Sequence, residues 1–139
     1  MALAYLLDTN SLSDAIRNPR GVTVRMMRNV GLASLCTSSI VSSEMRYGAL
    51  KNGSPRLMQD VKGLFERISV VDYDDAASRE YAEIRTSLER AGKVIGLTDL
   101  HIAAHARALG LTLVTDNVRE FSRVEGLKIE NWLERTDND

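Results

Sequence analysis

Four acidic residues lie far apart in the sequence, in surroundings that predict a common pocket: Asp8, Glu44, Asp99 and Asp116. Asp8 and Asp116 each follow an apolar run that is typical of a buried strand. Ligands of open parallel sheets bind beyond the carboxyl ends of the strands, so we expect these two aspartates to face one crevice. Asp99 is expected to begin a helix and Glu44 to lie on another, and both could reach the same crevice.

Carboxylates that are brought close together repel one another unless a cation neutralises them. Oxygen ligands select hard ions such as Mg²⁺ or Mn²⁺. A metal ion held in this way could polarise a phosphodiester and lower the pKa of a bound water, which then becomes a hydroxide nucleophile. Two metal ions could clamp the attacking and leaving oxygens, or one could act with a carboxylate as general base. The sequence does not choose between these schemes, but both predict metal-dependent cleavage of a phosphodiester bond.

Each acid also has a purely structural interpretation. Asp99 could simply belong to a helix start, Asp116 to a turn, and Glu44 to the many glutamates that lie on helix surfaces. Asp8 is harder to explain in this way, because a carboxylate that ends an apolar strand needs partners. The functional interpretation therefore rests on the set of four.

Strands and helices alternate along the chain. Strands are predicted at 3–7, 35–37, 68–71, 111–115 and 127–129. Helices are predicted at 11–17, 22–30, 40–51 and 57–65, from Asp74 to a stop at Gly92, from an N-cap at Thr98 to Gly110, and as a turn at 118–121. This pattern predicts an α/β fold with a mainly parallel sheet. We assign residues 1–134 to one domain and residues 135–139 to a polar, frayed tail.

The composition is that of an ordinary soluble protein, with a net charge of −1. Its single cysteine, Cys36, excludes an internal disulfide and fits the reducing cytoplasm. No signal peptide and no run of about 20 apolar residues is visible, so no membrane contact is expected. Between Ala15 and Ser43 there are four arginines and no acid. This basic stretch could hold phosphates beside the acidic pocket, or it could be a solvated helix face.

Other motifs are weak. Neither GxGxxG nor Walker A occurs, which argues against dinucleotide and P-loop sites. His101 and His105 have the spacing of a zinc helix, but Ile102 stands where a zinc protease needs glutamate. We expect both histidines to be surface or partly packed residues. Trp132 is expected to pack or to lie in an interface.

Five segments in order carry a resemblance to a known family: LLDTN, SSEMRYG, IGLTDLHIAAHA, LVTDNVREF and GLKIENW. No single segment is specific, but the ordered set is. Over nearly its whole length the sequence resembles the PIN-domain family, and in particular the VapC and FitB-like toxins of bacterial toxin–antitoxin pairs. The second segment matches an E-x-x-x-G element with Glu44 and Gly48. Because a glycine inside a helix costs stability, we expect another group to approach Gly48 closely.

The resemblance implies a single domain with a mostly parallel five-stranded sheet flanked by helices. It implies a Mg²⁺- or Mn²⁺-dependent endoribonuclease in which Asp8, Glu44, Asp99 and Asp116 bind metal and activate water. Hydrogen bonds from Asn10, Thr115 and Asn117 would hold these carboxylates. Many relatives have asparagine at the Asp116 position.

The resemblance also implies partners. It predicts a homodimer that is silenced by a cognate antitoxin, whose C-terminal segment lies over the site, and a structured RNA substrate such as tRNA. Two alternatives remain open: a non-catalytic RNA- or protein-binding module on the same fold, and a phosphatase of small esters. The phosphatase is disfavoured because Asn10 stands where a D-x-D pattern needs a second aspartate.

Overall fold

The computed structural model describes residues 2–133. Its strands are β1 (Tyr5–Leu7), β2 (Leu35–Ser38), β3 (Ser69–Val71), β4 (Thr112–Val114) and β5 (Ile129–Glu130). They form one five-stranded sheet in the order β3-β2-β1-β4-β5, and every pairing is parallel. The predicted α/β class and parallel sheet are therefore confirmed. The predicted tail at 135–139 lies outside the described residues.

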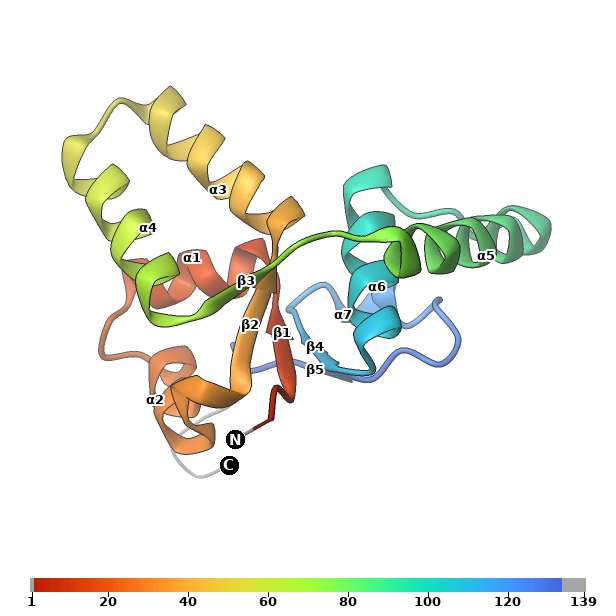
Figure 1. Ribbon diagram of the computed structural model, residues 1–139, viewed down its shortest axis with the longest axis horizontal. Helices are drawn as coiled ribbons and strands as arrows, with labels where there is room; N and C mark the ends of the chain where they lie inside the picture. The colour runs from red at the N-terminus through yellow and green to blue at the C-terminus, as the bar shows by residue number, and fades with distance from the viewer. Residues whose placement is uncertain (1, 134–139) are drawn as a thin grey trace.

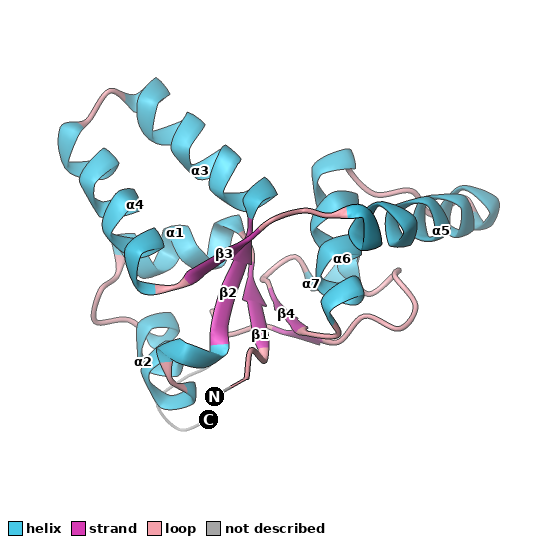
Figure 2. Ribbon diagram, in the orientation of Figure 1, coloured by secondary structure: helices cyan, strands magenta, loops and turns pink. Residues whose placement is uncertain are grey.

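Helices cover both faces of the sheet. One face carries α1 (Thr9–Arg17), α2 (Val22–Val30), α3 (Ser39–Asn52) and α4 (Pro55–Arg67), whereas α5 (Asp75–Ala91), α6 (Leu97–Leu109) and the short α7 (Val118–Phe121) lie on the other (Figures 1 and 2). A 3₁₀ turn, Leu32–Ser34, leads into β2. In the part of the chain that the structure describes, no helix is both long and apolar enough to cross a membrane.

The central strands are buried on both faces, as their apolar runs predict. Leu6 and Leu7 of β1 and Leu113 and Val114 of β4 have no exposed surface. Cys36 of β2 is also fully buried, and Trp132 packs edge-on against Tyr5, with the two ring centroids 5.2 Å apart. The core is thus built from the strands whose ends carry Asp8 and Asp116.

The connections leave β1 and β4 in opposite directions. From β1 the chain runs to β2, and from β4 it runs to β5 on the other side. Such a reversal between neighbouring strands opens a crevice at their carboxyl ends, where open parallel sheets bind ligands. Asp8 and Asp116 lie at this crevice, because they follow the last residues of β1 and β4 within two positions.

Three helices, α1, α4 and α6, begin two residues before the predicted start. α1 begins at Thr9 rather than at residue 11, because Asp8 itself is the N-cap. Thr98 is not the N-cap of α6. Gly96 holds that position without a side-chain cap, and its backbone N–H donates to Glu120 Oε1 over 2.8 Å. An acid distant in sequence therefore satisfies this helix start.

Candidate active site

Asp8 joins the end of β1 to the start of α1. Its Oδ1 accepts a hydrogen bond from the backbone N–H of Ser11 over 3.0 Å, and its own N–H donates to the carbonyl oxygen of Val114 over 3.0 Å. Only 5% of Asp8 is exposed. Burial raises the pKa of this carboxyl group, the Thr115 hydroxyl lowers it, and the nearby charge of Asp116 raises it again. Asp8 is thus a buried acid whose charge needs compensation.

Glu44 approaches from α3, the helix that follows β2. The hydroxyl of Thr9 donates to Glu44 Oε1 over 2.9 Å. This bond ties the first residue of α1 to an exposed glutamate on another helix, so it aims Glu44 at the end of β1. The expected close approach to Gly48 is wrong: a Cβ there would meet nothing within 4 Å, because Gly48 lies on the exposed face of α3.

Asp99 is half-buried in the first turn of α6, opposite Glu120 of α7. Burial is the largest of the causes that raise the pKa of Asp99 to about 7; the hydrogen bond and charge of Glu120 add to it, followed by the charges of Asp8 and Glu44. The pKa of Glu120 is lowered, chiefly by the backbone N–H of Gly96. The Asn117 amide bridges the pair, because its Nδ2 donates both to Asp99 Oδ2, over 3.5 Å, and to Glu120 Oε2. A proton shared by the two acids therefore resides on Asp99.

Asp116 is exposed at the end of β4, where Asn10 Nδ2 donates to its Oδ1 over 3.2 Å. The neighbouring Thr115 is fully buried, and its hydroxyl accepts from the backbone N–H of Asn117 over 3.0 Å. Each side chain that we expected to support the acids thus contacts one of them or orders the loop beside them.

Glu120 is a fifth acid at this site, and we did not identify it from the sequence. It belongs to a helix of four residues, too short to show a periodic pattern. The one signal was its place three residues after Asn117, where a single turn of helix brings the two side chains together. Thr9 was also overlooked, although it stands between Asp8 and Asn10.

The side chains at the crevice offer oxygen ligands, which fit a hard divalent cation. Three of the acids, Glu120, Asp8 and Glu44, lie close enough to Asp99 to raise its pKa. Among residues 2–133, however, no three acidic, histidine or cysteine side chains already surround one point closely enough to hold a metal ion. Hydrogen bonds from Thr9, Asn10 and Asn117 hold Glu44, Asp116 and Asp99 instead, each from a neutral donor.

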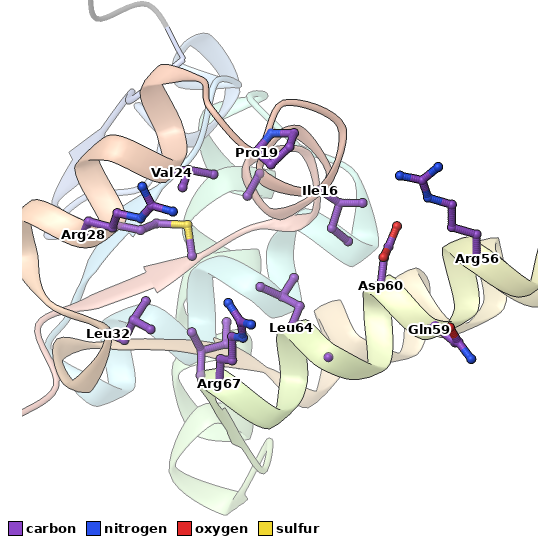
Figure 3. A pocket seen from close by; sticks show the side chains of 14 residues that line it. Ile16, Pro19, Val24, Arg28, Leu32, Arg56, Gln59, Asp60, Leu64 and Arg67 are labelled. Carbon is purple, nitrogen blue, oxygen red and sulfur yellow. The ribbon is translucent and has the colours of Figure 1, made fainter.

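Two arginines of the basic stretch lie away from these acids. Arg17 ends α1, a helix of nine residues whose N-cap is Asp8, so it lies roughly 13 Å along the axis from Asp8. Arg28 of α2 lines a separate hollow of about 420 Å³ between α1, α2 and α4, together with Arg56 and Arg67 (Figure 3). Arg17 and Arg28 therefore lie away from the crevice, and a role of this stretch in holding phosphates stays a prediction.

The two histidines of α6 differ from each other. His101 is partly buried and stacks on Tyr81, with ring centroids 4.3 Å apart. His105 has no exposed surface, so describing it as a surface or partly packed residue was wrong. The reason is that α6 lies between the sheet and α5, and most of its circumference is covered, including Leu100, Ile102 and Ala103.

The family model described as PIN domain matches residues 5–127. The protein named Ribonuclease VapC2 from Haemophilus influenzae is 41% identical over 133 residues, which cover 94% of this chain and 99% of the relative. The tRNA(fMet)-specific endonuclease VapC from Shigella flexneri is 42% identical over 131 residues, 94% of this chain and 98% of the relative.

Solved structures agree with this similarity. The DNA-bound VapBC structure from Salmonella typhimurium contains a chain with a TM-score of 0.88 and 40% identity, covering 94% of this chain and 98% of that one. VapBC2 from Rickettsia felis, bound to a DNA fragment from its promoter, gives a TM-score of 0.85 at 34% identity, covering 94% of this chain and 99% of that one. This chain is similar to one chain of each structure.

Proposed function

Because this chain belongs to the PIN-domain family, we propose that it is a divalent-metal-dependent endoribonuclease, the toxin of a toxin–antitoxin pair. The observation that carries the proposal is the group of acids at the crevice between β1 and β4. Burial, together with the neighbouring carboxyl groups of Glu120, Asp8 and Glu44, raises the pKa of Asp99 to about 7. A purely structural set of carboxylates would not be placed together at such a cost.

Asp8, Asp99 and Glu44 would hold the metal ion, Mg²⁺ or Mn²⁺, with Asp116 and Glu120 at its edge. The ion, when bound, supplies the acidity that turns water into a nucleophile and stabilises charge on the phosphate. The chain supplies the arrangement: the N-cap bond fixes Asp8, Thr9 aims Glu44, and Asn117 orients both Asp99 and Glu120. The proton on Asp99 would leave as the cation enters, since a carboxylate binds metal only when it is ionised.

The substrate that we propose is a structured RNA, and tRNA in particular. A relative that is 42% identical over nearly its whole length is named a tRNA(fMet)-specific endonuclease. The exposed position of Glu44 and Asp116 leaves the crevice open to a large polymer. We also propose a cytoplasmic location, where a substrate of this kind is found.

The partner that we propose is a protein antitoxin that blocks the crevice. The VapBC structures from Salmonella typhimurium and Rickettsia felis, each bound to DNA, support this partner. We also propose that this chain forms a homodimer. In this arrangement the antitoxin would silence cleavage until it is removed.

The substrate proposal can be tested with purified tRNAs. Initiator and elongator methionine tRNAs would be incubated with the purified chain and Mg²⁺, and the products sequenced. We expect a single cut in one of them, and no cut in EDTA. If intact tRNA is recovered while a generic phosphate ester is turned over, the chain is a phosphatase. If neither reacts but tRNA binds, it is a binding module.

A further inference from the structure

A buried histidine links two of the helices that carry the acids. His105 of α6 has no exposed surface, and its Nδ1 lies 2.7 Å from the hydroxyl oxygen of Ser38. Burial lowers the pKa of the ring, which is therefore neutral at pH 7. Its Nε2 faces the main chain of Asp72 but makes no hydrogen bond of normal geometry among the described residues.

Ser38 stands where β2 ends and α3 begins. It is fully buried, and its hydroxyl caps α3 by accepting from the backbone N–H of Ile40 over 3.1 Å. The same hydroxyl meets His105, so one oxygen atom joins the end of a strand, the start of α3 and the middle of α6. A hydroxyl has one donor and two acceptor positions, and it can serve both partners at once.

Tyr73 closes the surroundings of this bond. The segment between β3 and α5 passes the start of α3 (Figure 1), and there the backbone N–H of Tyr73 donates to the Ser39 hydroxyl over 3.0 Å. The Tyr73 ring packs edge-on against His105, with centroids 5.5 Å apart. The bond between His105 and Ser38 is therefore shielded from water, where a hydrogen bond holds its geometry most firmly.

The bond to Ser38 is the one hydrogen bond of normal geometry that the His105 ring makes among the described residues. The neighbours of His105 on α6, Ile102, Ala103, Ala104 and Ala106, are buried and apolar. An apolar side chain of similar size would pack there without leaving a ring nitrogen unsatisfied, a cost that buried polar groups carry. What the imidazole adds is a directed contact with the start of α3.

We propose that His105 is a positioning residue, and that its hydrogen bond to Ser38 sets the place of Asp99 relative to Glu44. Asp99 lies on α6, the helix of His105, and Glu44 lies on α3, the helix that Ser38 caps. The bond fixes how far α6 can slide or turn against α3. The inference rests on the proposed metal-dependent cleavage, for which these two acids must meet one cation.

Two substitutions separate the bond from the packing. His105→Leu keeps most of the volume and removes the bond, whereas His105→Asn places an amide near the position of Nδ1. We expect His105→Leu to lower kcat for RNA cleavage between about tenfold and a hundredfold, with KM little changed, and to weaken Mg²⁺ binding measured by calorimetry. His105→Asn should keep most of the wild-type kcat and most of the Mg²⁺ affinity. Arg107→Met is the control, because Arg107 ties α6 to Glu80 and Glu83 of α5 and not to α3.

All variants would be assayed well below their melting temperatures. If His105→Leu and Arg107→Met lower stability equally and both keep the wild-type kcat and Mg²⁺ affinity, the role of His105 is packing alone and the proposal is overturned. A double-mutant cycle with Ser38→Ala gives a second test. We expect the double variant His105→Leu/Ser38→Ala to lose no more kcat than Ser38→Ala alone. Fully additive losses of kcat would contradict a shared bond. Wild-type protein that neither cleaves RNA nor binds Mg²⁺ would instead overturn the proposed function.

Discussion

The carboxyl group of Asp99 is hydrogen-bonded to the carboxylate of Glu120, although the two residues belong to different helices. Two ionised carboxylates cannot form such a bond, so it requires a proton. That proton resides on Asp99, whose pKa is raised to about 7, and not on Glu120, whose pKa the backbone N–H of Gly96 lowers. Below about pH 7 the metal-free site thus contains a removable proton where a cation is expected to bind.

This proton predicts how stability depends on pH. In the unfolded chain Asp99 has a pKa near 4. Between about pH 4 and pH 7 the folded chain therefore binds one more proton than the unfolded chain, and the free energy of unfolding falls as pH rises. We expect the melting temperature in EDTA to drop from pH 5 to pH 8, and Asp99→Asn to flatten this trend. A melting temperature that rises over this range, equally in both proteins, would contradict the assignment.

Magnesium should reverse the loss of stability that we expect as pH rises. A cation that binds only the folded chain stabilises it by roughly 2.7 kcal/mol at a concentration 100-fold above the dissociation constant. We expect Mg²⁺ to raise the melting temperature more at pH 8 than at pH 5.5, because at the lower pH it must displace the proton on Asp99. Asp60→Asn, a charge change on the exposed face of α4, serves as the control. An identical Mg²⁺ effect in Asp8→Asn and in the wild type would place the cation elsewhere.

Thr9 tests whether aiming Glu44 matters. Thr9→Val keeps the shape of the side chain but removes the hydroxyl that donates to Glu44 Oε1. Because Glu44 is exposed and otherwise free to rotate, we expect kcat to fall between about tenfold and a hundredfold, with the melting temperature nearly unchanged. Thr9→Ser, which keeps the hydroxyl, should behave like the wild type. Equal activity in the valine and serine variants would show that the bond is dispensable.

Asp116 should be the most replaceable acid. It is exposed, and an asparagine there could still accept the hydrogen bond from Asn10. We expect Asp116→Asn to melt higher than the wild type in EDTA, since repulsion with Asp8 falls, and to lose about tenfold or less in kcat. Thermal melts and RNA cleavage measured on one preparation check both statements. A lower melting temperature in EDTA would mean that Asp116 is a structural residue.

The fold was readable from the sequence where local signals agree with tertiary structure. The apolar runs before Asp8 and Asp116 predict buried parallel strands, and parallel strands bring their carboxyl ends to one edge. The helix that follows Asp74 was correctly bounded because its N-cap and Gly92, with a φ of 66°, are local features. The sequence therefore predicted that the ends of these two strands meet at one crevice.

What could not be predicted depends on contacts between distant segments. Gly96 caps α6 because Glu120 satisfies its N–H, and no pattern near Thr98 reveals that partner. His105 resembles a surface residue on a helical wheel, and only the packing of α6 between two layers shows that it meets Ser38. Arg17 is near Asp8 in sequence but lies at the far end of α1, because nine helical residues span roughly 13 Å.

The most direct test is cleavage of total cellular RNA by the purified wild-type chain and by Asp8→Asn. Asparagine can still accept the N-cap bond from Ser11, so this substitution removes the charge with little effect on α1. We expect the wild type to produce a discrete product with Mg²⁺ and none with EDTA. Asp8→Asn should produce none under either condition, while Asp60→Asn cuts like the wild type. Equal cleavage by Asp8→Asn and the wild type would contradict a metal-dependent nuclease site at the end of β1.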